Sequence, residues 1–136
     1  MNAPMLTYQD TNGIKQAVSF RVNTTLMHKL LLHIGVPAHL YGYGFIIYAL
    51  ELILLDPDLL HHVTKGLYID VAQKFHTNPS RVERAIRHAI SVAWLHGDIT
   101  FINELFRNSI SPDKDTPTNT MFLARLYYYI VNREYE

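Results

Sequence analysis

The sequence has no cysteine, no net charge and no apolar run long enough to cross a membrane. Without cysteine the chain cannot form disulfides, thiolate zinc sites or a cysteine nucleophile, and its composition is compatible with a reducing cytoplasm. Twelve basic residues balance twelve acidic ones, so a nucleic-acid partner would have to be bound by a local basic surface. The most apolar stretch, residues 40–55, is shorter than the roughly 20 residues of a membrane span and predicts a buried helix.

The amino-terminal residues do not show the pattern of a secretory signal. No charged start is followed there by an apolar segment. We therefore expect a cytoplasmic protein that does not partner a membrane.

Residue combinations typical of enzymes and metal sites are also missing. No two of the eight histidines are four residues apart and no carboxylate cluster accompanies them, so we expect neither a metal ion nor another cofactor. The serines occur in no nucleophile-elbow sequence, and the chain has no glycine-rich phosphate loop. Acid pairs such as Asp56 and Asp58 flank a proline and fit helix caps and turns. The sequence predicts that the protein is not an enzyme.

The chain does contain helical periodicity, which begins near residue 23. Gly35 with Pro37, Asn78 with Pro79, and Gly97 are the stop and start signals expected between helices. The first predicted helix is capped by Asn23 or Thr24 and spans residues 24–34. The others span residues 45–55, 59–64, 67–75, 79–95 and 98–106, and a final helix begins at residue 118 or 119. No segment alternates with the period of a strand. The sequence predicts an all-α fold, a compact bundle of about six helices, with a loosely ordered arm at residues 1–22 and one domain at residues 23–136.

The segment from Leu67 to Leu95 has the spacing of a helix-turn-helix, with a short helix, a tight turn and a longer helix. On a helical wheel the longer helix divides into two faces. Its small apolar residues fall on one side and suit close packing against another helix. The polar side carries Ser80, Arg81, Arg84, Arg87, His88 and Ser91, with Glu83 near its edge.

Charge is distributed unevenly around this helix. Residues 65–88 contain five basic residues, among them Lys65, and two acidic ones, whereas residues 51–58 contain three acidic residues and no basic one. A duplex attracts such a local positive surface through its phosphates. Arginine can donate two hydrogen bonds to guanine, and a carboxylate can accept one from cytosine. From this pattern alone, a DNA-binding helix and a solvated basic helix in which Glu83 merely pairs with Arg87 both remain open.

Residues 80–90, followed by Val92-Ala93-Trp94, resemble the recognition helix of the C-terminal effector domain of the stage-zero sporulation master regulator, a response regulator of endospore-forming Firmicutes. Three further blocks resemble the same domain in order and approximate spacing. They are residues 33–39 with Gly42-Tyr43, residues 64–75, and residues 117–119. The resemblance covers about residues 24–132 and is far more specific than a generic helix-turn-helix pattern.

The resemblance implies a domain of about six helices that binds duplex DNA at short boxes of the TGTCGAA kind. Head-to-tail pairs of the domain bind such boxes and contact RNA polymerase sigma subunits. In this chain, Arg84 would contact guanine and Glu83 cytosine, while Arg81, Arg87 and His88 would contact the backbone or adjacent bases.

Phosphate contacts are expected at two helix starts. The resemblance places them at Asn78, Ser80 and the Thr118-Asn119 junction, and helix N-termini present free N–H groups to anions. The expected DNA-binding residues are Asn78, Ser80, Arg81, Glu83, Arg84, Arg87, His88, Lys65, Thr118 and Asn119.

The sequence also departs from the family. A receiver domain of roughly 120 residues with a phosphorylated aspartate precedes the family's effector domain, and only about 22 residues precede it here. The chain is therefore either a relative with different regulation, which Met1 favours, or a fragment. The segment after Tyr43 is more apolar than in the family and predicts either a core helix or a docking surface. An alternative function is a protein-interaction module of the same fold that binds a sigma subunit or another regulator instead of DNA.

Overall fold

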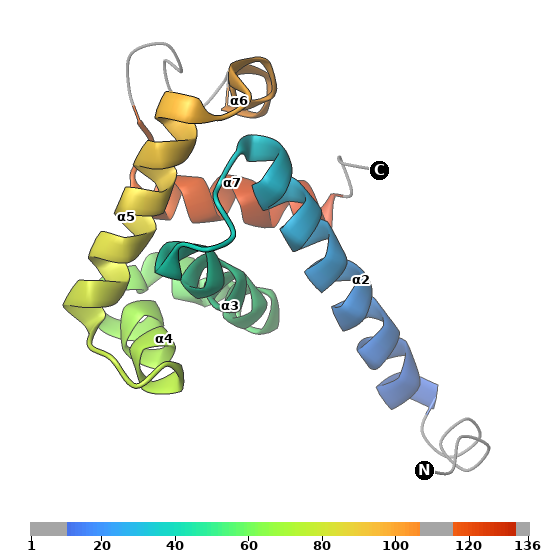
Figure 1. The fold of residues 1–136 in the computed structure, drawn as a ribbon. Helices are drawn as coiled ribbons and strands as arrows, with labels where there is room; N and C mark the ends of the chain where they lie inside the picture. Colours follow the sequence, from blue (N-terminus) through green and yellow to red (C-terminus); the bar gives the residue numbers. More distant parts are fainter. Residues whose placement is uncertain (1–10, 107–115, 133–136) are drawn as a thin grey trace.

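The computed structural model describes residues 11–106 and 116–132 and confirms the predicted all-α bundle. Figure 1 shows α5 along one side of the molecule, with α4 near its first turns, and α2 running diagonally on the other side. No described helix is both long enough and apolar enough to cross a membrane. The elements are α2 (Thr11–Ile34), α3 (Tyr41–Leu55), the short 3-10 helix η1 (Pro57–His61), the π-helical turn η2 (Val63–Leu67), α4 (Tyr68–Lys74), α5 (Pro79–His96), α6 (Ile99–Phe106) and α7 (Asn119–Val131).

The predicted start of the first helix is wrong. We expected a cap at Asn23 or Thr24 after a loosely ordered arm, but α2 is already helical at Thr11. Polar residues near the middle of the helix are accommodated rather than ending it, because the Thr25 hydroxyl donates a hydrogen bond of 3.0 Å to the carbonyl of Arg21 one turn earlier. Residues 1–10 of the expected arm lie outside the described residues.

The helix boundaries after residue 40 follow the stop and start signals expected from the sequence, with two differences. The apolar helix α3 begins at Tyr41 instead of Phe45, so both of its glycines are helical. The single short helix predicted at residues 59–64 is instead divided between η1 and η2. Asp56 caps η1 as expected, because its carboxylate accepts a hydrogen bond of 3.2 Å from the Asp58 N–H.

Most apolar residues of α3 belong to the core. Phe45, Ile46 and Ile47 are buried, and α3 packs against α2, α4, α5 and α7. Of the two interpretations of this apolar segment, the structure confirms the core helix.

The first turn of α3 lies unusually close to α5. A Cβ atom on Gly42 would come within 2.2 Å of the Ala85 carbonyl oxygen and 2.8 Å of the Ala89 Cβ. Glycine on α3 and alanines on α5 therefore allow the two helices to touch backbone to side chain. The small apolar face of α5 is used as the sequence predicted.

The turn between α4 and α5 is closed by a helix-ending motif. The N–H of Thr77 donates to the carbonyl of Ala72 at 2.9 Å, and the N–H of His76 donates to that of Gln73 at 3.4 Å. These are the two bonds of a Schellman motif, whose penultimate residue must be left-handed. His76 has φ of 55°, so a histidine occupies the position where glycine is usual. Asn78 then caps α5, because its side-chain oxygen accepts from the Arg81 N–H at 3.0 Å.

The opposite end of α5 is fixed to the end of α2 by two glycines. Gly35 is left-handed, with φ of 106°, and a Cβ there would lie 2.5 Å from the Gly97 Cα. A Cβ on Gly97 would lie 2.1 Å from the Ile34 carbonyl oxygen. The Asp98 N–H donates to that same carbonyl at 3.2 Å. Both predicted helix ends are confirmed, and they meet in one joint.

Candidate nucleic-acid interface

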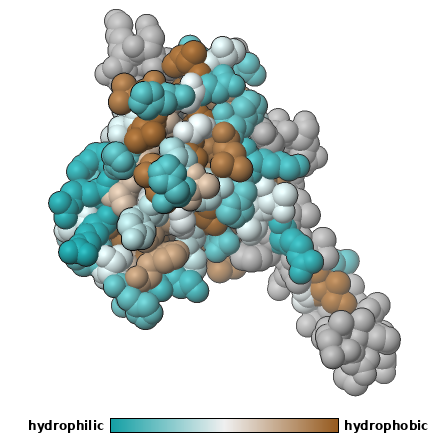
Figure 2. Space-filling view, viewed as in Figure 1, coloured by the Kyte–Doolittle hydropathy of each residue, from teal (hydrophilic) through white to brown (hydrophobic). Residues whose placement is uncertain are grey.

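Helix α5 has a buried face and an exposed cationic face. Val82, Ile86, Ala89, Ile90 and Ala93 are buried against the core. The opposite side carries the exposed residues Ser80, Arg81, Arg84, Arg87 and His88. Figure 2 shows hydrophilic side chains gathered at the edge of the molecule where α5 begins. The division predicted from the helical wheel is confirmed.

Arg81 and Arg84 occupy the first two turns of α5. No ion pair joins either guanidinium to a carboxylate within residues 11–106 and 116–132. Arg84 lies between two surface hollows, since it lines one on each side of α5. Thr64, Tyr68, Ser80 and Glu83 are among the residues that line the first of them, the polar hollow.

The second hollow, the aromatic hollow, lies on the α3 side of Arg84 and has a volume of about 550 Å³. Its walls include Tyr41, Phe45, Phe75, Arg81, Arg84 and Ala85. No local pattern in the sequence links these aromatic residues, because they come from α3 and from the turn after α4. Only the amphipathic pattern of α5 was visible locally.

Glu83 and Arg87 form an ion pair one turn apart on α5. The Glu83 side chain is 34% exposed and that of Arg87 is 61% exposed, so the pair lies at the border of the cationic face. This is the intrahelical pair that the sequence left open as one interpretation of Glu83. Of the three arginines on the face, only Arg87 has a carboxylate partner among the described residues.

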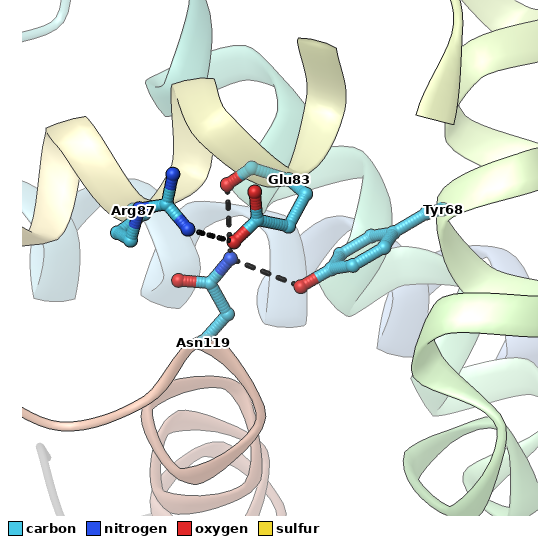
Figure 3. A network of polar contacts seen from close by, with 4 residues as sticks. All are labelled: Tyr68, Glu83, Arg87 and Asn119. Atoms are coloured by element: carbon cyan, nitrogen blue, oxygen red, sulfur yellow. Dashed lines mark hydrogen bonds and ion pairs between the residues drawn. The ribbon is translucent and has the colours of Figure 1, made fainter. Parts of the chain in front are cut away.

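Asn119 joins three helices below this pair (Figure 3). Its side-chain N–H groups donate to the Tyr68 hydroxyl at 2.9 Å and to the Glu83 backbone carbonyl at 3.0 Å. Asn119 is only 7% exposed, and burial raises the pKa of Tyr68, which favours the protonated hydroxyl. Both hydrogen bonds of the Asn119 side-chain amide are made within the protein, so a phosphate contact at the Thr118-Asn119 junction would use the backbone N–H groups.

The start of α7 still lies beside a predicted cation. Thr118 is the N-cap, and its hydroxyl accepts from the Met121 N–H at 3.1 Å. Lys65, Thr64 and Thr120 line a common shallow hollow, so the structure brings the exposed Lys65 to the first turn of α7. The loop that precedes this turn falls mostly at residues 107–115, outside the described residues.

The family model described as sporulation initiation factor Spo0A C terminal matches residues 27–130 of the chain. The protein belongs to this family. The Spo0A C-terminal family comprises DNA-binding effector domains of sporulation regulators and is not an enzyme family. Its match spans α3 to α6 completely, the last third of α2 and nearly all of α7. The resemblance seen in the four sequence blocks is therefore confirmed over the whole helix-turn-helix.

Proposed function

We propose that this protein is a transcription regulator that binds duplex DNA sequence-specifically, with α5 in the major groove. The observation that carries the proposal is the pair of exposed arginines, Arg81 and Arg84, on the first turns of a helix whose opposite face is buried. Recognition helices present their N-terminal side chains to base edges in this manner. Within the chain described, neither guanidinium is neutralised by a carboxylate.

Each residue of the cationic face receives a role in this proposal. Arg84 donates to guanine, and Glu83 accepts from cytosine once Arg87 has moved to a phosphate. Arg81 and His88 contact adjacent bases or the backbone. Ser80, Asn78 and Lys65, with the backbone N–H groups at Thr118 and Asn119, bind phosphates along the two strands.

The proposed partners are short boxes of the TGTCGAA kind, a second copy of the chain on an adjacent box, and a sigma subunit of RNA polymerase. Membership of the family supports these partners. A protein with these partners would act in the cytoplasm. The alternative, a module that binds only protein, is less favoured, because Phe45, Ile46 and Ile47 of the apolar segment that suggested it are buried.

Selection of bound duplexes from a random pool tests the proposal. We expect enrichment of one short box, and an affinity that falls with salt at a slope near −0.9 per phosphate contact. Arg84→Ala is expected to cost about 1–3 kcal/mol on the selected box and much less on random DNA. Lys29→Ala is the matched control, since Lys29 is an exposed cation on α2. An equal loss on both duplexes would remove base recognition from Arg84, and failure to enrich any sequence would refute sequence-specific binding.

A further inference from the structure

We propose that the aromatic hollow beside α5 recognises the C5-methyl group of a thymine next to the guanine contacted by Arg84. The inference rests on the proposed function and extends it to a second base. The hollow and the base-contacting helix share Arg81, Arg84 and Ala85, so a duplex contacted by both arginines would lie against the rim of the hollow.

The chemistry of the walls identifies the occupant. One wall consists of Tyr41, Phe45 and Phe75, and the other combines the two arginines with Ala85, while Thr77 adds one hydroxyl to the lining. Phosphate and sugar oxygens gain nothing from an aromatic wall. Thymine carries the one apolar group that a base presents in the major groove, and such methyls are contacted by alanine and phenylalanine side chains.

The aromatic wall is formed before any ligand arrives. Phe75 packs edge-to-face on Phe45, with ring centroids 5.1 Å apart, and again on Tyr48 at 5.9 Å. Tyr41 lies over Phe45 at 6.5 Å between centroids. Phe45 is buried, whereas Phe75 is 41% and Tyr41 85% exposed, so the wall has a fixed base and an accessible rim. The part of the wall that Phe45 and Phe75 form is held by this packing and loses little entropy when a base packs on it.

The charge of the hollow fits the same occupant. None of the described residues that line it carries a carboxylate, and the two guanidinium groups at its edge attract the strand that carries the thymine. The hollow on the other side of Arg84 is different, because Thr64, Ser80 and Glu83 give it a polar lining. The α3 side of α5 therefore suits an apolar base edge, and the opposite side suits polar groups.

The test replaces each thymine of the selected box in turn by deoxyuridine, which lacks only the C5-methyl. Burial of one methyl corresponds to about a fourfold change in affinity. We expect about this loss at one thymine adjacent to the guanine of Arg84 and little change elsewhere. In Tyr41→Ala and Phe75→Ala that position should become insensitive to deoxyuridine, whereas Phe75→Leu, which keeps an apolar wall, should retain the sensitivity. Tyr128→Ala is the matched control, because Tyr128 is 53% exposed on α7 and away from the hollow.

The outcomes separate this inference from the proposed function. Sequence-specific binding without any thymine-to-deoxyuridine effect would overturn the methyl site and leave the proposed function intact. Persistence of the effect in both Tyr41→Ala and Phe75→Ala would also overturn it. If Tyr41→Ala weakens binding only to paired boxes, the hollow contacts a neighbouring copy of the chain and the methyl site is refuted. If no duplex is bound specifically, both proposals fail together.

Discussion

The Ala85 carbonyl oxygen lies 2.2 Å from the point that a Cβ atom on Gly42 would occupy. Gly42→Ala should therefore push α3 away from α5 and lower the free energy of unfolding by about 1–3 kcal/mol or more. Gly44 is the control, since it lies on the same helix and a Cβ there would meet nothing within 4 Å. Gly44→Ala should raise stability by up to about 1 kcal/mol through helix propensity. Urea denaturation measures both changes, and equal effects would contradict the close packing.

Asn119 holds the start of α7 against α4 and α5 through two hydrogen bonds. Asn119→Ala leaves the Tyr68 hydroxyl without this donor, and we expect a loss of about 1–3 kcal/mol in the free energy of unfolding. Thr120→Ala changes an exposed neighbour and should have little effect. A double-mutant cycle with Tyr68→Phe measures the coupling directly. Additive losses would show that the Asn119–Tyr68 bond does not contribute.

His76 is the left-handed residue in the turn of the helix-turn-helix. His76→Gly should stabilise the protein by about 1 kcal/mol, because glycine adopts this conformation without the steric cost that a Cβ brings. His76→Ala keeps the Cβ and should give no such gain. Thermal denaturation compares the three proteins, and a gain in the alanine variant would show that the histidine ring, and not the backbone, is the source of strain.

The Glu83–Arg87 pair predicts that Glu83→Gln affects binding to random DNA and binding to the selected box differently. Glu83→Gln removes the charge that holds Arg87, so binding to random DNA should tighten and its salt slope should steepen by about 0.9. On the selected box the same substitution should weaken discrimination for cytosine, because an amide can also donate. Fluorescence anisotropy over a salt series measures both. If the preference for cytosine is unchanged, Glu83 acts only as the intrahelical partner of Arg87 and does not contact the base.

Glu51 makes stability depend on pH. Burial raises its pKa above the ordinary value of 4.5, while His28, Thr24 and Lys74 act in the opposite direction. Between 4.5 and the raised pKa the folded protein binds more protons than the unfolded chain, so stability falls as pH rises through this interval.

Glu51→Gln should therefore raise the free energy of unfolding at pH 7 and leave it nearly unchanged at pH 4. Urea denaturation at the two pH values measures this difference. Glu104→Gln, at an exposed glutamate of α6, is the control. A loss of stability at pH 7 would mean that the attraction to His28 and Lys74 outweighs the cost of burial.

The sequence was most informative where one helix carries its own pattern. The buried and exposed sides of α5 follow from the spacing of its residues, because a helix places every third or fourth residue on the same face. The cap at Asn78 and the end at Gly97 are equally local, since each depends on the conformational preference of one residue. These features placed the cationic face before any tertiary contact was known.

Other features depend on neighbours that are distant in sequence. Asn119 is 51 residues from Tyr68 and 36 from Glu83, so no local pattern distinguishes its buried amide from a phosphate-binding one. The aromatic hollow likewise needs Tyr41 and Phe75 to meet at α5. The early start of α2 was missed because isolated polar residues weaken helix propensity, although Thr25 satisfies its hydroxyl within the helix.

The joint between Gly35 and Gly97 fixes the orientation of α2 relative to α5. A helix of 24 residues is about 36 Å long, and its far end departs from the body of the molecule in Figure 1. The joint leaves no space for a side chain on either glycine, so the two helices can move little relative to each other. A protein or domain attached to the first turn of α2 would therefore be held in a fixed orientation relative to α5.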